Sequence, residues 1–331
     1  MNSQSARLAS SLLLIASGCL FAQAPRSIGP ASTGGRIADF AVANLPGKAE
    51  VMYVGTASGG VFKSANAGVS WSPIFDHAGA MMSIGAVAVA PSNPNEVWVG
   101  TGEVDNRQSS SWGDGIYKSL DGGATWHRMG LEPTRHIAKI IVDPNNANVV
   151  YVAALGHLWG SNPERGVYKT TDGGLTWKLV LFHDDNTGAT DLAMSPTDPN
   201  VVYAALYQRQ RKGWGYNGGG PGSGIYRTND GGATWKQLTV GLPAGDKGRI
   251  GLATSPQNSS LVYAIVEADP PAGRGGAGGA APAPGGPGGR GARAGAGAGP
   301  PPARGGVFRS LDQGETWEHL SPLNPRPSYY S

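Results

Sequence analysis

The chain has 331 residues, of which 40% are hydrophobic and 15% are charged, and its formal net charge is +3 at pH 7. This length and apolar content are enough for one large buried core or for an array of repeats. Residues 270–306 carry four arginines and no acid, so the remainder of the chain is close to neutral. A nucleic-acid-binding surface needs a basic face on the folded part, and this charge distribution predicts none.

The first 24 residues have the layout of an export signal. Arg7 gives a basic start, residues 12–15 form an apolar centre, and Ala22-Gln23-Ala24 is a small-x-small cleavage site. We therefore predict a signal peptide over residues 1–24. The mature protein is expected to be exported, periplasmic or secreted, with no transmembrane span after cleavage.

Cys19, which lies inside this signal, leaves lipoprotein anchoring through its side chain open as an alternative. Ala16-Ser17-Gly18-Cys19 loosely resembles a lipoprotein cleavage box, although Ala16 stands where a larger aliphatic residue is usual. Because Cys19 is the only cysteine, cleavage after Ala24 excludes disulfides, thiolate metal sites and cysteine nucleophiles from the mature chain.

After the signal, a cycle of short strands repeats along the chain. Each cycle has an apolar inner strand such as residues 84–90, then a Pro/Asn turn, then a second strand such as Val149-Val150-Tyr151-Val152. The third strand is a glycine followed by two apolar residues and a base, as in Gly166-Val167-Tyr168-Lys169. Helix signals are nearly absent, so the pattern predicts an all-β chain.

One eight-residue stretch closes every cycle, and its clearest copy is Ser119-Leu120-Asp121-Gly122-Gly123-Ala124-Thr125-Trp126. An Asp or Asn side chain can accept bonds from backbone N–H groups just ahead of it and so close a turn. The Trp then leads into a fourth, outer strand and buries a large apolar area. Further copies lie at 170–177, 228–235 and 310–317, and a divergent one at 64–71 has Asn66 in place of Asp. We predict a structural role for Asp121, Trp126, Asp172, Trp177, Asp230, Trp235, Asp312 and Trp317.

This stretch is identified as the Asp box of sialidase-like and sortilin-like β-propellers. The chain resembles bacterial exported Asp-box (BNR-like) repeat proteins related to the sortilin N-terminal domain, also through segments such as residues 55–60, 113–115 and 154–160. The resemblance implies a β-propeller in which each cycle is one four-stranded antiparallel blade. About five blades are present in a domain over residues 25–331, and nothing in the sequence closes the ring.

The spacing of the repeat also locates an insertion. Successive Asp-box tryptophans are 55, 51, 58 and 82 residues apart, and the long last interval contains a Pro/Gly/Ala/Arg-rich run at 269–305. Such a run has no side chains able to offset the entropy of ordering. We predict a disordered loop inserted between the second and third strands of the fifth blade.

Candidate ligand-binding residues lie in the loops that the blade does not need. In a propeller, second-to-third-strand loops and the loops between blades share one face, and three of the former carry a Trp with a nearby Arg. Exposed aromatics flanked by polar groups are typical of sugar and peptide sites, although these tryptophans could instead pack the loops together. The candidates are Arg36, Arg107, Trp112, Arg135, His157, Trp159, Arg165, Trp214, Tyr216 and Arg249.

The predicted function is an exported binding module for an extracellular glycan or a peptide or protein ligand. One alternative is a glycoside hydrolase. Sialidases place three arginines on the substrate carboxylate, and Arg36, Arg135 and Arg249 could be laid over that set, but the Arg-Ile-Pro signature is absent because Ala38 follows Ile37. Other glycosidases need only two carboxylates. Those available are Glu103, Asp105, Asp114, Glu164 and Asp185.

The other alternative is a structural scaffold for a site completed by further blades. We assign no catalytic residue from the sequence. No metal-ligand, nucleotide-binding or hydrolase signature occurs, so neither a metal nor a cofactor is expected.

Overall fold

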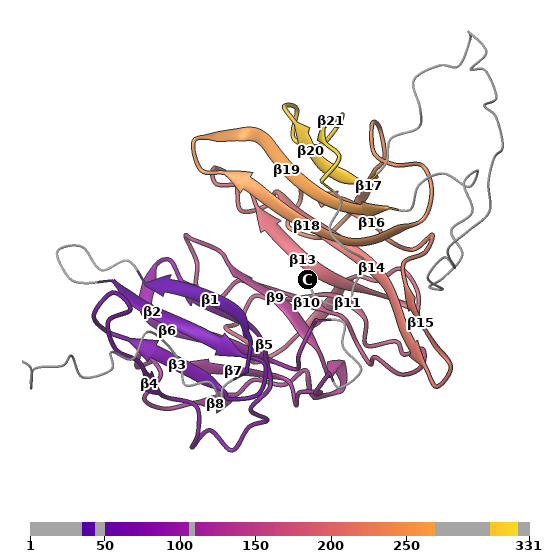
Figure 1. The fold of residues 1–331 in the computed structure, drawn as a ribbon. Helices are drawn as coiled ribbons and strands as arrows, with labels where there is room; N and C mark the ends of the chain where they lie inside the picture. The colour runs from indigo at the N-terminus through magenta and orange to yellow at the C-terminus, as the bar shows by residue number, and fades with distance from the viewer. Residues whose placement is uncertain (1–34, 44–49, 106–109, 269–304, 324–331) are drawn as a thin grey trace, which may run out of the picture.

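The computed structural model describes residues 35–43, 50–105, 110–268 and 305–323 (Figure 1). The predicted signal peptide, Cys19 and nearly all of the predicted insertion at 269–305 lie outside these residues. Within the described part, no helix is long and apolar enough to cross a membrane.

Five antiparallel sheets follow one another along the described chain, each with its strands in chain order from the inside outwards. Figure 1 shows the indigo first sheet and the orange and yellow fifth sheet at the two ends of this row. The sheets are blade 1 (β1–β4), blade 2 (β5–β8), blade 3 (β9–β12), blade 4 (β13, β14, β16 and β17, with β15 paired to β14) and blade 5 (β18–β21). The predicted all-β propeller of about five four-stranded blades is confirmed.

The strands are β1 (Ile37–Ala43), β2 (Val51–Thr56), β3 (Val61–Ser64), β4 (Ser72–Pro73), β5 (Ile84–Ala90), β6 (Asn93–Thr101), β7 (Ile116–Ser119), β8 (His127–Arg128), β9 (Ile137–Val142), β10 (Val150–Ala154), β11 (Gly166–Thr170), β12 (Lys178–Leu181), β13 (Thr187–Met194), β14 (Val202–Lys212), β15 (Gly215–Gly218), β16 (Gly224–Thr228), β17 (Lys236–Leu238), β18 (Lys247–Ser255), β19 (Asn258–Ala268), β20 (Gly306–Ser310) and β21 (Glu318–Ser321).

One predicted loop is a strand pair instead. Residues 207–216, which carry Trp214 and Tyr216 and were among the second-to-third-strand loops of the candidate residues, are not a loop, because β14 continues through them and turns at Gly213-Trp214 into β15. Tyr207 and Arg209 point inwards and are buried, whereas the intervening Gln208 is half-buried. This alternation has the period of a strand, which explains the extension.

The apolar core lies between blades rather than inside any one of them. Each of four buried clusters joins two neighbouring blades, as where Val87 of β5 packs with Tyr53 of β2. Trp98 of β6 is fully buried and meets Trp177 of the next blade edge-to-face, with ring centroids 6.3 Å apart. A fully buried large apolar side chain contributes about 1.5–3 kcal/mol, so each blade depends on its neighbours.

The turn before each outer strand is closed by its own Asp or Asn side chain. Asp121 Oδ1 accepts hydrogen bonds from the backbone N–H groups of Ala124 and Thr125, both 2.9 Å long, and Oδ2 accepts one from Thr125 Oγ1 at 2.6 Å. Asn66 makes a neutral version of this turn, in which its Oδ1 accepts from the Ser70 N–H at 2.9 Å. Trp126 and Trp177 reach back to the preceding blade, where their Nε1 groups donate to Ile74 O at 2.8 Å and to Met129 O at 2.7 Å.

A second contact between blades, here called the inter-blade clamp, recurs at these turns. In blade 3, Tyr151 OH and Lys169 Nζ both donate to Gly231 O, in the turn of blade 4, at 2.9 and 2.7 Å. Tyr53 and Lys63 bind Gly122 O in the same way, as Tyr203 and Arg227 bind Gln313 O. In blade 2, Trp98 replaces the tyrosine and Lys118 alone reaches Gly173 O, at 3.4 Å.

Candidate functional site

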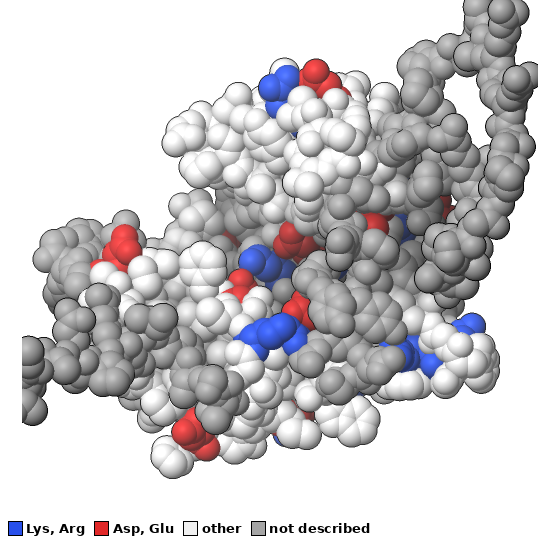
Figure 2. All heavy atoms as spheres, in the orientation of Figure 1, with Lys and Arg blue, Asp and Glu red and all other residues white. Residues whose placement is uncertain are grey.

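The loop that follows β6 reaches the middle of the molecule and is held there by three arginines. Arg36, just before β1, pairs with Glu103 and also with Asp105 at 3.4 Å. Arg249 of β18 binds the other Asp105 oxygen at 3.1 Å. Arg209 of β14 donates to Val104 O at 3.0 Å. Figure 2 shows side chains of both charges lying side by side near the centre of the face that it presents.

Arg36, Arg135 and Arg249, the three arginines that could match the sialidase set, lie in two different places. Arg36 and Arg249 converge, but on the chain's own Asp105. Arg135 lies elsewhere, with its guanidinium 5.1 Å from the ring centroid of Trp112. The structure therefore does not bring the three together around an open position.

Next to this loop, the inner strands line a cavity of about 170 Å³ that contains Asp39, Lys139, Asp191 and Arg249. Asp39 accepts the Val87 N–H of the next blade at 3.1 Å, and Asp191 accepts the Leu252 N–H of the next blade at 2.7 Å. Burial raises the pKa of Asp191, against the lowering effect of the Leu252 and Leu192 N–H groups and of the charges of Lys139 and Arg249. Both acids lie at register shifts of their strands. Because each carboxylate accepts a backbone N–H of the next blade, both stabilise the contact between neighbouring blades.

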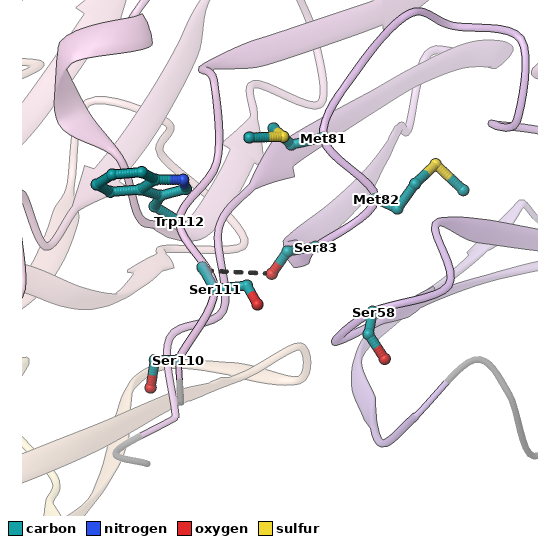
Figure 3. Close-up of a pocket in the computed structure, with 7 residues that line it drawn as sticks. All are labelled: Ser58, Met81, Met82, Ser83, Ser110, Ser111 and Trp112. Carbon is teal, nitrogen blue, oxygen red and sulfur yellow. Dashed lines mark hydrogen bonds between the residues drawn. The ribbon is translucent and has the colours of Figure 1, made fainter. Parts of the chain in front are cut away.

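A groove on blades 1 to 3, here called the Trp112 groove, consists of two adjacent cavities that share Ser110 and Trp112. The larger, about 360 Å³, is lined by Ser58, Met81, Met82, Ser83, Ser110, Ser111 and Trp112 (Figure 3). The smaller, about 160 Å³, is lined by Ser110, Trp112, Arg135, His136, His157, Leu158 and Trp159.

Two tryptophans at this groove present their indoles to solvent. Trp112 is 59% exposed and Trp159 is 56% exposed, whereas the blade residue Trp98 is fully buried. Arg135 is held beside Trp112 because its carbonyl accepts the Gly113 N–H at 2.7 Å. A Cβ on Gly113 would lie 2.3 Å from the Thr101 carbonyl carbon, so this close approach requires glycine.

His136 and Arg165, two polar residues close to the groove, are buried beneath the loops. His136 is 3% exposed, and burial, with neighbouring positive charges, holds its pKa well below the ordinary value, so it stays neutral. Arg165 is 1% exposed and donates to the carbonyls of His157, Gly160 and Asn186. Burial lowers the pKa of Arg165 to about 10, which leaves it protonated. The structure thus places Arg165 inside the blade 3 loop rather than at the groove surface.

The remaining candidates are spread out. His157 lines the groove, and its Nε2 lies 2.9 Å from Pro133 O. Trp214 is 88% exposed at the tip of the β14–β15 hairpin and does not line either cavity of the groove. Tyr216 OH is 2.9 Å from Tyr207 OH on the same hairpin. Arg107 lies outside the described residues.

The candidate acids of the loops are mostly engaged. Asp114 accepts hydrogen bonds from Tyr117 OH at 2.8 Å and from Arg128 at 3.1 Å, and Glu103 and Asp105 are paired with arginines as above. Glu164 is half-buried and Asp185 is exposed. Among the described residues, no group of three or more His, Cys, Asp or Glu side chains is arranged to hold a metal ion.

Asp39 and Arg209 were not among the residues that the sequence predicted to be functional. Asp39 stands in an otherwise apolar inner strand, and that break in the pattern was a usable signal. Arg209 had no such signal, because it lies in a continuous run of polar residues at 208–212 and its partner, Val104 O, is 105 positions away.

Known proteins resemble this chain over part of its length. A family model described as sortilin, neurotensin receptor 3 matches residues 114–243. A xyloglucanase of Paenibacillus sp is 28% identical over 217 residues, which are 59% of this chain and 20% of that protein. Xyloglucanase Xgh74A of Acetivibrio thermocellus is 26% identical over 229 residues, 59% of this chain and 25% of that protein. The xyloglucanase of Hypocrea jecorina is 33% identical over 164 residues, 45% and 18% of the two chains.

Solved structures show the same fold. An ancestral GH74 enzyme superposes with a TM-score of 0.52 at 23% identity, covering 73% of this chain and 30% of that one. The GH74 enzyme of Niastella koreensis gives 0.54 at 16% identity, with 85% and 38% covered. The chain spans about a fifth to a quarter of the length of the curated relatives that it matches.

Proposed function

We propose that this chain is part of a glycan-active β-propeller of the glycoside hydrolase type and that its Trp112 groove binds a polysaccharide of the xyloglucan kind. The sequence relatives support this over a peptide-binding module, because those cited above are xyloglucanases.

The exposed indoles of Trp112 and Trp159 are the observation that carries the proposal. Both border the same small cavity, at which Arg135 and His157 add polar groups. Pyranose rings present flat C–H faces that stack on indoles, while flanking polar groups bind their hydroxyls. A large apolar ring left in solvent beside a cavity is otherwise unfavourable, so binding a sugar gives it a role.

Binding is tested by titrating soluble xyloglucan into the full chain in a calorimeter. We expect saturable binding that is weakened about tenfold or more in Trp112→Ala and Trp159→Ala, a loss of about 1.4 kcal/mol for each. Trp214→Ala is the matched control, because it removes an indole that is 88% exposed and lines neither cavity of the groove. Unchanged affinity in both groove variants would exclude this surface as the binding site.

Hydrolysis is tested separately, by measuring new reducing ends released from xyloglucan by the full chain. Release that is lost in Asp185→Asn or Glu164→Gln, but retained after substitution of the tryptophans at saturating substrate, supports glycoside hydrolase activity in this chain.

Binding without turnover is the second candidate, and the engaged acids favour it. Glu103, Asp105 and Asp114 are tied to arginines, and Asp39 and Asp191 to backbone N–H groups. A glycosidase needs an acid free to deliver a proton. Affinity for xyloglucan with no release of reducing ends would select this candidate.

We also propose that residues 1–24 are a signal peptide for export and that residues 269–305 are a disordered loop inserted into the fifth blade. Export suits a protein whose substrate is a polysaccharide outside the cell. N-terminal sequencing of protein recovered after export should find cleavage after Ala24.

A further inference from the structure

The smaller cavity of the Trp112 groove is lined by cationic, polar and aromatic side chains and, among the described residues, by no acid. Its polar lining beside the two indoles consists of Ser110, Arg135, His136 and His157. Its volume of about 160 Å³ is below the roughly 300–1,000 Å³ of a typical small-molecule site. The cavity can therefore hold one ring or one substituent of a longer ligand.

Arg135 presents to this cavity a guanidinium that no acid in the described chain neutralises. Its guanidinium carbon lies 5.1 Å from the ring centroid of Trp112, and no described residue forms an ion pair with it or accepts a hydrogen bond from it. Arg128 shows the more common arrangement, since it pairs with Asp114 at 3.1 Å. A guanidinium has five N–H donors in a fork that matches the two oxygens of a carboxylate. Arg135 is therefore able to bind an anion that enters the cavity.

The backbone holds Arg135 at the cavity in an unusual conformation. Arg135 has φ 61° and ψ −36°, directly after the short turn Glu132–Thr134. Residues with a Cβ rarely adopt a positive φ, and strained positions of this kind cluster at ligand sites. Two short hydrogen bonds maintain it, from Gly113 N–H to Arg135 O at 2.7 Å and from His136 N–H to Thr134 O at 2.6 Å. The position of the guanidinium is thus set by the backbone and by the indole beneath it.

Further positive charge lies close to the cavity, below its surface. Arg165 and Arg209 are 1% and 2% exposed, and within the described chain both donate only to backbone carbonyls. Burial, followed by neighbouring positive charges of which that of Arg209 is the first, lowers the pKa of His136. Asp184 and Asp185 offset this charge at Arg165, but neither lines the cavity. The cavity is therefore electropositive and favours an anionic group.

We propose that the smaller cavity binds the carboxylate of an acidic sugar residue and that Arg135 selects it. This inference rests on the proposed function, in that the groove binds a glycan, and it narrows the substrate class to glycans that carry carboxylates. The Arg135 N–H groups donate to both carboxylate oxygens, in the bidentate pairing typical of these groups. Trp112 and Trp159 favour a sugar over an acidic peptide, because an acidic side chain has no flat ring face to stack on exposed indoles.

Two polymers that differ only in their carboxylates test this inference. They are soluble xyloglucan and the same xyloglucan with part of its primary alcohols oxidised to carboxylates. Calorimetric titration of the full chain should give an affinity about tenfold or more higher for the oxidised polymer, and added salt should reduce this preference. Arg135→Gln should lose the preference but keep most of the affinity for neutral xyloglucan, because its amide still binds hydroxyls. Arg135→Lys should keep part of the preference, because it retains the charge without the fork.

Lys178→Gln is the matched control, because it removes an exposed positive charge that lines neither cavity, and it should leave the preference unchanged. Circular dichroism establishes that the variants are folded. The inference is overturned if wild type binds both polymers equally, if Arg135→Gln keeps the preference, or if polyglutamate binds through Arg135 as tightly as the oxidised polymer. In those cases, binding of neutral xyloglucan that Trp112→Ala weakens leaves the proposed function standing. Binding of neither polymer would overturn both.

Discussion

Asp230 illustrates how the local donors of a turn control an exposed carboxylate. Its Oδ2 accepts Thr234 Oγ1 at 2.6 Å and its Oδ1 accepts Thr234 N and Thr228 Oγ. These bonds lower the pKa of Asp230 to about 2, from an ordinary value of 3.8, and the corresponding bonds in the turn of Asp312 lower its pKa to about 2 as well. In the other two Asp-containing turns, the corresponding bonds hold the pKa values of Asp121 and Asp172 well below the ordinary range.

The turns should therefore make the protein sensitive to acid. A carboxyl whose pKa is lower when folded stabilises the protein above its unfolded pKa, and this contribution is lost as pH falls from about 3.8 towards 2. Asp230→Asn should remove its share of that loss, because an amide does not titrate, and should be less stable than wild type at neutral pH by that share, while still closing the turn as the native Asn66 does. Asp230→Ala should lower stability at neutral pH too. Urea unfolding across this pH range measures both, and an acid slope that Asp230→Asn leaves unchanged would contradict the assignment.

The clamp is the corresponding device at the level of strands and blades. Two donors from adjacent strands share one buried carbonyl of the next blade, so neither donor is essential while the other remains. Tyr151→Phe alone should therefore cost about 0.5–1.5 kcal/mol. With Lys169→Met added, Gly231 O loses both donors, and the double variant should lose about 1–3 kcal/mol more than the sum of the single losses.

A double-mutant cycle by urea denaturation measures this coupling. Tyr151→Phe with Lys178→Met is the control, because Lys178 is exposed on the neighbouring strand and pairs in register with Lys169. Its two effects should simply add. Additivity in the Lys169 cycle as well would mean that the two donors do not act on the same acceptor.

At this level the sequence predicted much of what the structure shows. The repeated Gly, apolar, apolar, base strands could be placed because their pattern depends on neighbours within a few residues. The clamps could not, since Tyr151 and Gly231 are 80 positions apart and only the stacking of blades brings them together. Arg165 illustrates the same limit, because a surface loop and a loop folded over its own arginine have similar composition.

At the scale of the whole molecule, Asp105 connects parts of the chain that are otherwise far apart. It joins Arg36, 69 positions before it, to Arg249, 144 positions after it, and so links blades 1, 2 and 5. Predicting this from sequence would require the curvature of the row of blades, which no local pattern encodes. The sequence therefore singled out Asp105, Arg36 and Arg249 as separate candidates, without predicting that the two arginines pair with this acid.

Replacing Asp105 by Asn should loosen this connection while leaving each blade folded. Arg36 and Arg249 are part-exposed, so solvent screens both of their ion pairs with Asp105. Loss of the Asp105 charge should therefore cost at most about 1.5–3 kcal/mol. We expect faster amide hydrogen exchange in β1 and β18, with little change in β10 and β11 of blade 3. High salt should bring wild type towards the variant, because it weakens the same ion pairs. Asp76→Asn, at an exposed acid outside the centre, is the control for loss of charge. Uniformly faster exchange in all five blades would instead mean that Asp105 supports folding generally rather than joining the ends of the row.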